Sequence, residues 1–339
     1  MTATSSAREP AMVDVARLAG VSHQTVSRVL NNHPNVRVDT ARRVRAAIAE
    51  LGYRPNRAAR ALVTGRSQLI GVVALNTGLY GPSSLLTAFE RAASAAGFAV
   101  SVGTVGSADG QSIAAVVERH LDQQVAGIVA IAPVAPANEA LDGLRATVPL
   151  VTVDGDPDRP SVGVTVDQVA GARMATEHLL AAGHETVWHV SGPPDWFDSA
   201  GRVRGWESAL RDAGAEIPPL VPADWSAASG YRVGRMLARV PEVTAVFTAN
   251  DHLALGLLRA LHERSLRVPQ DVSVVGFDDV PEAGYFIPPL TTVRPDFQAV
   301  ATHALDLLLA QINGETPGAE QRCMAPALVQ RSSVAGPRA

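Results

Sequence analysis

The sequence predicts an N-terminal all-α domain built around a helix-turn-helix, followed by a larger α/β core of two lobes. Three observations support this fold class. Two short helical patterns meet at a glycine near the N-terminus, strand and helix patterns alternate from Ser67 onward, and positive charge is concentrated in the first part of the chain. At 339 residues, the chain is long enough for two or three domains with a large core.

Two short helices are expected between Val13 and Leu30. The first ends at Gly20, a stop signal, and its apolar residues recur at helical spacing: Val15, Ala16, Leu18 and Ala19. Ser22 is a good N-cap for the second helix, whose apolar side consists of Val26, Val29 and Leu30. A helix, a turn that contains glycine and a second helix form a helix-turn-helix, which places its second helix in the DNA major groove.

The polar side of the second helix carries residue types that suit base reading: His23, Gln24, Thr25 and Arg28. Gln pairs bidentately with adenine, and Arg pairs bidentately with guanine. An ordinary helical hairpin would explain the apolar pattern equally well, so both interpretations stay open on this segment alone.

A third helix is expected next. Asp39 is its predicted N-cap, Gly52 ends it, and its apolar positions are Ala41, Val44, Ile48 and Leu51. The segment Tyr53-Arg54-Pro55-Asn56 follows, and then a short basic helix from Arg57 to Val63 that carries Leu62. Taken alone, Leu62 would be read as an ordinary packing residue.

Charge is distributed unevenly along the chain. The overall balance is −4, but the segment from Arg8 to Arg66 holds 11 Arg and 4 acidic residues, a local balance of +7. The remainder therefore holds 18 basic and 29 acidic residues, a balance of −11. A basic N-terminal segment on an acidic body fits a nucleic-acid-binding arm attached to a regulatory domain.

Residue usage excludes several kinds of site. All 29 basic residues are Arg, so a P-loop and a lysine Schiff base are excluded. The single cysteine, Cys323, excludes an intrachain disulfide framework and a Cys-rich metal site. The N-terminus lacks the pattern of a signal peptide, and no apolar stretch reaches the length of a membrane span. We therefore expect a cytoplasmic protein without a metal or a cofactor.

From Ser67 onward, strand and helix patterns alternate, which argues for parallel sheets covered by helices on both faces. Two such sets within about 270 residues predict two lobes. The expected strands span 69–75, 99–105, 127–132, 148–153, 186–190, 245–248 and 272–277. The expected helices span 84–96, 109–123, 167–182, 202–213, 253–264 and 297–312.

Polar residues follow several expected strands, where ligands of doubly wound sheets bind. They are Asp154, Asn250, Asp251, Asp278 and Asp279, and Arg202 and Arg204 lie at the start of an expected helix. Trp196, Trp225 and Phe297 add aromatic faces. Such a set would satisfy both the hydroxyls and the apolar C–H faces of a sugar. Each residue alone is more often a turn former, an N-cap or part of the core, but their coincidence predicts a pocket.

The sequence lacks a recognisable catalytic set. G-x-S-x-G, H-E-x-x-H and G-x-G-x-x-G are all absent. His184, His189 and His252 are expected to be satisfied core or surface residues. The pair Asp278–Asp279 could do glycosidase chemistry, but adjacent side chains tend to point differently, and the basic segment would then have no role. A cytoplasmic sugar-binding or sugar-processing protein is the alternative to a DNA-binding regulator.

The chain resembles the LacI/GalR family of transcriptional repressors. The resemblance is carried by DVARLAGVSxxTVSRVLN, by TxxxVxxAIAELGYRPNxxAxxL and, in the body, by AND at Ala249–Asp251, VVGFDD and IPPLTTVRPDF. It covers nearly the full length with few gaps, and the lactose repressor subgroup is the most similar in these stretches. It implies a two-lobed, periplasmic-binding-protein-like core and the function of a repressor that a sugar releases from its operator.

The resemblance also implies how DNA is bound. In this family the segment after Pro-Asn is a hinge helix that folds on operator DNA, and a leucine matching Leu62 wedges into the minor groove, where an apolar side chain can kink the duplex. The expected partner is palindromic operator DNA, bound by a homodimer. The expected DNA-contacting residues are Ser22, His23, Gln24, Thr25, Ser27, Arg28, Asn31, Tyr53, Asn56, Arg57, Ala59 and Leu62.

For the effector, the resemblance implies two groups of contacts. Asp154, Arg202, Asn250 and Asp278 would hydrogen-bond the sugar, while Leu79, Trp225 and Phe297 would line its apolar side; Trp196 is added on chemical grounds alone. A β-galactoside or β-glucoside disaccharide is favoured. A nucleoside or a sugar phosphate is the alternative effector.

The expected domains are a helix-turn-helix domain over 1–55, a hinge helix and linker over 56–66, and an effector-binding and dimerisation core over 67–339. Within the core, we expect lobe 1 at about 67–166 and 298–325, and lobe 2 at about 167–294 and 326–334.

Three departures from the family pattern stand out. Ala11 replaces the usual Ser or Thr cap, which should weaken the first helix by roughly 0.5–2 kcal/mol. Pro295 replaces a common Gln, and the chain ends without a leucine-heptad tail, which favours a dimer over a tetramer.

Overall fold

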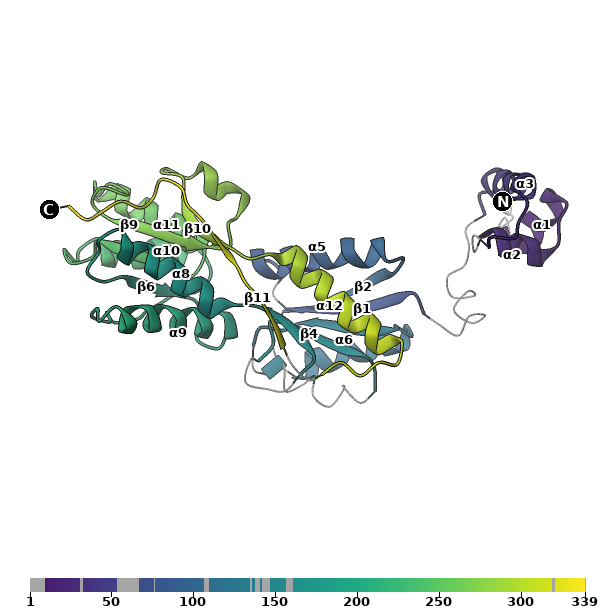
Figure 1. Ribbon diagram of the computed structural model, residues 1–339, viewed down its shortest axis with the longest axis horizontal. Coiled ribbons are helices and arrows are strands. Elements are labelled where there is room, and N and C mark those ends of the chain that lie inside the picture. Colours follow the sequence, from purple (N-terminus) through teal and green to yellow (C-terminus); the bar gives the residue numbers. More distant parts are fainter. Residues whose placement is uncertain are drawn as a thin grey trace, which may run out of the picture. The chain divides into compact units, whose positions relative to one another are not determined.

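The computed structural model describes residues 10–30, 33–53, 67–75, 77–106, 110–134, 136–137, 141, 147–156, 161–318 and 321–338. The chain separates into two units, Met1–Ser67 and Gln68–Ala339. The described part of the first unit is helical, and the second unit mixes helices and strands (Figure 1).

The described residues of the first unit form three short helices: α1 (Met12–Ala19), α2 (His23–Leu30) and α3 (Val38–Leu51). They pack around Val15, Val26 and Val44, which are fully buried. The predicted helix-turn-helix is therefore present. Gly20 ends α1 with a φ of 63°, a left-handed conformation that glycine adopts without a steric cost.

The caps of these helices follow from single residues. The Ser22 hydroxyl accepts a hydrogen bond from the Thr25 amide at 3.2 Å, as expected of an N-cap. Ala11 has no side-chain acceptor to offer at the start of α1, and the Asp14 carboxylate instead accepts the Ala11 amide at 2.9 Å. This contact supplies half of a capping box, so the other half is missing from α1.

Leu18 lies in α1 as expected but is 45% exposed, unlike Val15, Ala16 and Ala19. One predicted detail of the first unit is wrong. Asp39 is not the N-cap of α3, since the helix begins at Val38 after Arg37. Asp39 instead lies in the first turn, where its charge suits the helix dipole, and it pairs with Arg42.

Within the described part of the second unit, the strands form two six-stranded sheets. The first has the order β11-β5-β4-β3-β1-β2, and each pairing in it is parallel. Its strands are β1 (Leu69–Leu75), β2 (Ala99–Val105), β3 (Gly127–Ile131), β4 (Leu150–Val153), β5 (Gly163–Val166) and β11 (Gln321–Met324). The second has the order β12-β10-β9-β8-β6-β7, with only β12 antiparallel. Its strands are β6 (Trp188–Ser191), β7 (Val221–Pro222), β8 (Ala245–Thr248), β9 (Ser273–Phe277), β10 (Thr291–Arg294) and β12 (Ala327–Val329).

Helices cover both faces of each sheet, as the strand–helix alternation predicts. On the first sheet, α5 (Tyr80–Ala95) and α12 (Phe297–Ile312) share a core with one face, and α6 (Gly110–Asp122) packs on the other. On the second, α8 (Gln168–Ala181) and α9 (Phe197–Asp212) lie opposite α10 (Ala227–Leu237) and α11 (Asp251–Glu263). We refer to each sheet with its helices as the first lobe and the second lobe.

The chain crosses between the lobes three times, at 166–168, 294–297 and 324–327. The C-terminal strands β11 and β12 therefore belong to different sheets, and α12 returns to the first lobe after β10 has completed most of the second (Figure 1). Each crossing starts at the carboxyl end of a strand in one lobe and leads to the other lobe. A ligand site is expected at these carboxyl ends.

Several element boundaries differ from the prediction. Helix α5 begins at Tyr80 rather than at residue 84, and α9 begins at Phe197 rather than at Arg202. Strands β5, β7, β10, β11 and β12, the short 3-10 helix η1 (Pro281–Tyr285) and helix α10 were not predicted. Arg202 therefore lies inside a helix and not at its start.

Candidate functional site

Helix α2 presents an exposed polar face. Ser22, His23, Gln24 and Arg28 are exposed, while Thr25 is half-buried and its hydroxyl lies 2.9 Å from that of Ser22. Arg28 forms no ion pair with a residue that the structure describes, so its guanidinium is available to an external acceptor. Ser27, also half-buried, lies on the same helix.

The remaining DNA-contact candidates fall into two groups. Tyr53 is described and is 8% exposed, so its ring belongs to the core of the first unit. The hinge helix and five candidates lie outside the described residues: Asn31, Asn56, Arg57, Ala59 and Leu62.

In the second unit, a cavity is lined by residues of both lobes. The first lobe contributes the start of α5, and the second contributes the segments that follow β6, β7, β8 and β9 together with α9. Its walls are formed by Leu79, Tyr80, Gly81, Pro82, Trp196, Asp198, Arg202, Trp225, Asn250 and Asp278. Six of the eight predicted effector residues are therefore gathered at one cavity.

Arg202 is the cation of this cavity. Its Nε donates to Gln168 Oε1 at 2.9 Å, its Nη1 donates to the Ala249 carbonyl, and its Nη2 lies 3.6 Å from Asp278 Oδ1. The guanidinium carbon also lies 3.7 Å from the centre of the Phe277 ring. These contacts orient Arg202 while it is only 4% exposed.

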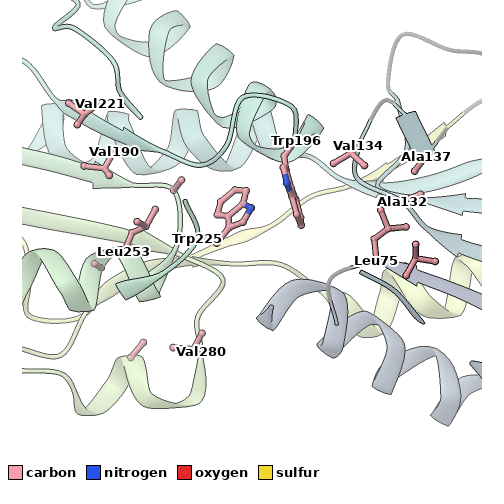
Figure 2. Close-up of a cluster of buried hydrophobic side chains, with 14 of the residues drawn as sticks. Leu75, Ala132, Val134, Ala137, Val190, Trp196, Val221, Trp225, Leu253 and Val280 are labelled. Atoms are coloured by element: carbon pink, nitrogen blue, oxygen red, sulfur yellow. The ribbon is translucent and has the colours of Figure 1, made fainter. Parts of the chain in front are cut away.

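Two indoles form an aromatic wall. The rings of Trp196 and Trp225 meet edge to face, with centroids 5.4 Å apart and planes at 69°. Figure 2 shows them between apolar side chains of the second lobe, such as Val190 and Leu253, and those of the first lobe, such as Leu75. Trp225 is 9% exposed, and its Nε1 has no hydrogen-bond partner among the described residues.

The Trp196 segment also ties the two lobes together through the backbone. Trp196 pairs with Val134 in an isolated antiparallel bridge, and the Phe197 amide donates to the Pro133 carbonyl at 2.9 Å. A change in the angle between the lobes would strain these contacts, which lie beside the cavity.

Asn250 and Asp278 are held by the loops that follow β8 and β9. Asn250 caps α11, because its Oδ1 accepts the Leu253 amide at 2.8 Å, and its Nδ2 donates to the Trp225 carbonyl at 3.1 Å. Asp278 has a φ of 102°, and its amide donates to the Val293 carbonyl at 2.8 Å. Asn250 is thus both an N-cap and part of the cavity wall.

Two predicted effector residues do not line this cavity. Asp154 Oδ1 accepts the Thr165 hydroxyl at 3.2 Å and the Val166 amide at 3.3 Å, so it lies behind the wall, at the end of β4. Phe297 packs edge to face on Tyr80, with centroids 6.1 Å apart. Tyr80 lines the cavity and Phe297 does not.

Four lining residues were missed: Tyr80, Gly81, Pro82 and Asp198. The segment Gly78-Leu79-Tyr80 could have suggested Tyr80, since Leu79 was already a candidate. Asp198 was assigned to a loop, and only the early start of α9 places it one turn before Arg202.

Burial dominates the electrostatics of the site. It raises the pKa of Asp278 to about 7, against the lowering effect of Arg202, and raises the pKa of Asp154 to about 8, helped by the charge of Asp198. Burial also raises the pKa of Asp198. One guanidinium therefore does not neutralise three carboxyl groups in this region.

The histidines were expected to be structural, and two of them are. His189 stacks on Phe247 with centroids 4.5 Å apart, and burial lowers its pKa to about 3. His184 is buried and lies 3.0 Å from both the Thr244 hydroxyl and the Ala335 carbonyl.

The side chains of Asp278 and Asp279 point in different directions, as expected, since Asp279 pairs with Arg294 and Arg331.

Family models identify both parts of the chain. The model of bacterial regulatory proteins of the lacI family matches residues 11–56, and that of the periplasmic binding protein-like domain matches residues 176–334. The lactose operon repressor of Escherichia coli K12 is 35% identical over 330 residues, which are 96% of this chain and 91% of that protein. The chain belongs to the LacI family.

Solved structures agree with this assignment. The lac repressor dimer bound to operator and the anti-inducer ONPF matches with a TM-score of 0.87 and 33% identity, over 97% of this chain and 100% of that chain. A complex of the transcriptional regulator CelR with cellobiose matches with a TM-score of 0.72 and 32% identity, over 96% and 99%. The protein is thus a DNA-binding transcriptional regulator and not an enzyme.

The described residues include no helix that is both long and apolar enough to cross a membrane. They also include no group of three or more His, Cys, Asp or Glu side chains arranged to hold a metal ion.

Proposed function

We propose that this protein represses sugar-utilisation genes and is released from its operator when a neutral sugar binds between the lobes of its core. The observation that carries this proposal is the cavity itself, where Asp278, Asn250 and Arg202 face two indoles. A sugar needs polar partners for its hydroxyls and apolar faces for its C–H groups, and this wall offers both.

The charge of the cavity favours a neutral effector over a phosphorylated one. Arg202 is shared between Gln168, Ala249 and Asp278, and the carboxyl groups around it outnumber it. A phosphate would add negative charge to a buried site that already lacks positive charge, which is costly. A sugar phosphate therefore fits worse than a β-galactoside or β-glucoside disaccharide, the class to which the cellobiose of the CelR complex belongs.

For DNA, we propose that α2 enters the major groove with His23, Gln24 and Arg28 toward the bases. Ser22, Thr25, Ser27, Asn31, Tyr53, Asn56, Arg57 and Ala59 complete the proposed contact set, and Leu62 is proposed as the minor-groove wedge of a hinge helix. We assign the helix-turn-helix domain to 1–55, the hinge helix and linker to 56–66, and the regulatory core to 67–339. Since operator DNA is its target, the protein would act in the cytoplasm.

A homodimer is the proposed assembly, because two reading helices must match two palindromic half-sites. The second lobe carries large apolar side chains that are unusually exposed. Ile287 is 93% exposed, Tyr285 is 87% exposed, and Met236 on α10 and Leu255 on α11 are 53% and 42% exposed. Apolar surface of this kind favours a protein partner, and the lac repressor of the operator complex is a dimer.

The DNA half of the proposal is tested by replacing Gln24, which is exposed on α2. Gln24→Ala should weaken binding to a palindromic operator by about 1–3 kcal/mol per half-site, the value of one good base contact. Binding to random duplex should hardly change, because phosphate contacts dominate it. The measurement is fluorescence anisotropy at fixed salt.

Glu50→Ala is the matched control, since Glu50 is exposed at the end of α3. An equal loss on operator and random DNA would show that Gln24 does not read bases. Sugar binding is followed separately, through the intrinsic fluorescence of Trp196 and Trp225. If a nucleoside or a sugar phosphate, and no neutral sugar, changed that signal, the proposed effector class would be wrong.

A further inference from the structure

The cavity contains a second carboxylate, Asp198, beside the expected Asp278. Asp198 lies in the first turn of α9, one turn before Arg202, and lines the cavity together with Asp278. It also lines a neighbouring cavity next to Thr165 and Gln168. Asp198 therefore lies between the effector cavity and the segment near residues 166–168, where the chain crosses from one lobe to the other.

The carboxylate of Asp278 has unused hydrogen-bonding capacity. Among the described residues its only partner is Arg202, at 3.6 Å, which is an ion pair too long to be a hydrogen bond. An ionised carboxylate can accept about four hydrogen bonds. Because Asp278 is only 8% exposed, a ligand in the cavity would have to supply the missing donors.

The indole N–H of Trp225 is a second, independent feature that indicates a ligand in this cavity. Trp225 lines the same cavity, is 91% buried, and its indole N–H finds no acceptor among the described residues. Buried N–H groups are seldom left unpaired. A ligand that fills this cavity must therefore accept from Trp225 and donate to the carboxylates.

Building on the proposed sugar effector, we propose that Asp198 and Asp278 form a pair of acceptors for two hydroxyl groups of a neutral sugar, while Trp225 Nε1 donates to the same ligand. A hydroxyl group both donates and accepts, so it matches a wall that carries both kinds of group. An ammonium group only donates, and it would leave Trp225 unpaired and face the charge of Arg202.

This arrangement couples sugar binding to proton release. Burial raises the pKa of Asp278 to about 7, with a smaller contribution from the charge of Asp198. Donors on the sugar would favour the ionised carboxylates and lower their pKa values. The complex would then hold fewer protons than the free protein, so affinity should rise with pH between about 6 and 8, by at most about tenfold per pH unit for each proton.

The other charged groups near the pair do not reverse this direction. Arg202 is the cation beside the pair, and the pKa of Tyr80 is raised by burial, so its phenol stays neutral. Burial likewise raises the pKa of Asp154 to about 8, so that it can lose a proton in the same range. Burial raises the pKa of Asp251 well above the usual value, and its carboxyl oxygens already accept hydrogen bonds from the Thr292 hydroxyl and the Val280 amide. His189, on β6, has a pKa of about 3 and stays neutral.

The test is isothermal titration calorimetry of the full-length protein with lactose and with cellobiose at pH 6, 7 and 8. Two buffers with different ionisation heats report the protons released. Asp198→Asn should lower the affinity at pH 8 by about tenfold or more and release fewer protons, because one ionisable acceptor is lost. Asp195→Asn is the matched control, since Asp195 is exposed in the same segment and does not line the cavity; its affinity should stay within twofold.

The outcomes separate this inference from the proposed function. If the wild-type protein binds a disaccharide and Asp198→Asn binds it equally well with the same proton release, the carboxylate pair is wrong and the sugar effector stands. If the wild type binds neither sugar while it still binds operator DNA, the proposed effector class falls, and the pair falls with it. A glucosamine disaccharide that binds more than tenfold tighter than cellobiose at pH 6 would show a site for cations and overturn the neutral-sugar pair. Thermal unfolding of each variant checks that it is folded.

Discussion

At the scale of single residues, the site depends on a carboxylate that does not line it. Asp251 is fully buried and accepts the Thr292 hydroxyl at 2.6 Å and the Val280 amide at 2.8 Å. These two contacts hold the loop after β9, in which Asp278 and Asp279 adopt positive φ angles of 102° and 50°. Asp251 therefore positions Asp278 without contacting the cavity.

Asp251→Ala should lower the free energy of unfolding by about 2–4 kcal/mol, because a buried hydroxyl and a buried amide would lose their acceptor. Urea denaturation followed by circular dichroism measures this loss. The control is Asp306→Ala, at an exposed position of α12, which should cost less than about 0.5 kcal/mol. Equal, small effects of the two substitutions would contradict the positioning role of Asp251.

Residue types after strands predicted much of the cavity, but not its full composition. Asp278 and Asn250 could be chosen because the ends of parallel strands meet at one edge, while Trp225 was chosen as an aromatic face and through the family resemblance. Asp198 could not, since its position depends on where α9 begins, whereas Tyr80 could have been suggested only by its neighbour Leu79. Asp154 carries the expected residue type, yet its hydrogen bonds to Thr165 and Val166 direct it behind the wall.

At the scale of elements, close packing between α10 and α11 shapes the second lobe. A Cβ atom built on Gly256 would lie 2.0 Å from the Ala227 carbonyl oxygen, and one on Gly230 would lie 2.2 Å from the Leu253 carbonyl oxygen. The two helix backbones approach so closely that only glycine fits at their contact. This pair positions Asn250, which caps α11.

Gly256→Ala should destabilise the core by about 1–3 kcal/mol, the usual cost of forcing extra volume into a packed contact. Gly81→Ala, in α5, is the control, because a Cβ at Gly81 meets no atom within 4 Å. Thermal unfolding of both variants gives the comparison. A Gly256→Ala protein as stable as wild type would show that the helices can separate at no cost.

Glycines inside helices help to explain why α10 was not predicted and why α9 begins earlier than expected. Helix α12 and strands β1, β2 and β8 have the predicted bounds, because their apolar patterns are continuous. Helix α10 contains Gly230 and Gly234, and α9 contains Gly201 and Gly205, which lower the helix propensity. Packing against neighbouring elements stabilises these helices in spite of their glycines, and a local sequence pattern does not show such long-range contacts.

At the scale of the whole molecule, regulation requires that the cavity bias two arrangements of the lobes. The Trp196–Val134 bridge and the Phe197–Pro133 hydrogen bond join the lobes next to the cavity. A sugar that contacts Tyr80 of one lobe and Asp278 of the other would bind the two arrangements with different affinities, which is the condition for allosteric coupling. In the proposed scheme, this shift separates the paired hinge helices and weakens operator binding.

The measurement that tests this scheme most directly is operator release by sugar, compared between wild type and Asp278→Ala. Anisotropy of a labelled palindromic operator is followed at fixed salt while lactose or cellobiose is added. We expect the sugar to weaken operator binding of the wild type by at least about 1–3 kcal/mol. Asp278→Ala should bind operator normally and ignore the sugar. If the variant still released the operator with sugar, or if the wild type bound sugar without any change in operator affinity, the account would be contradicted.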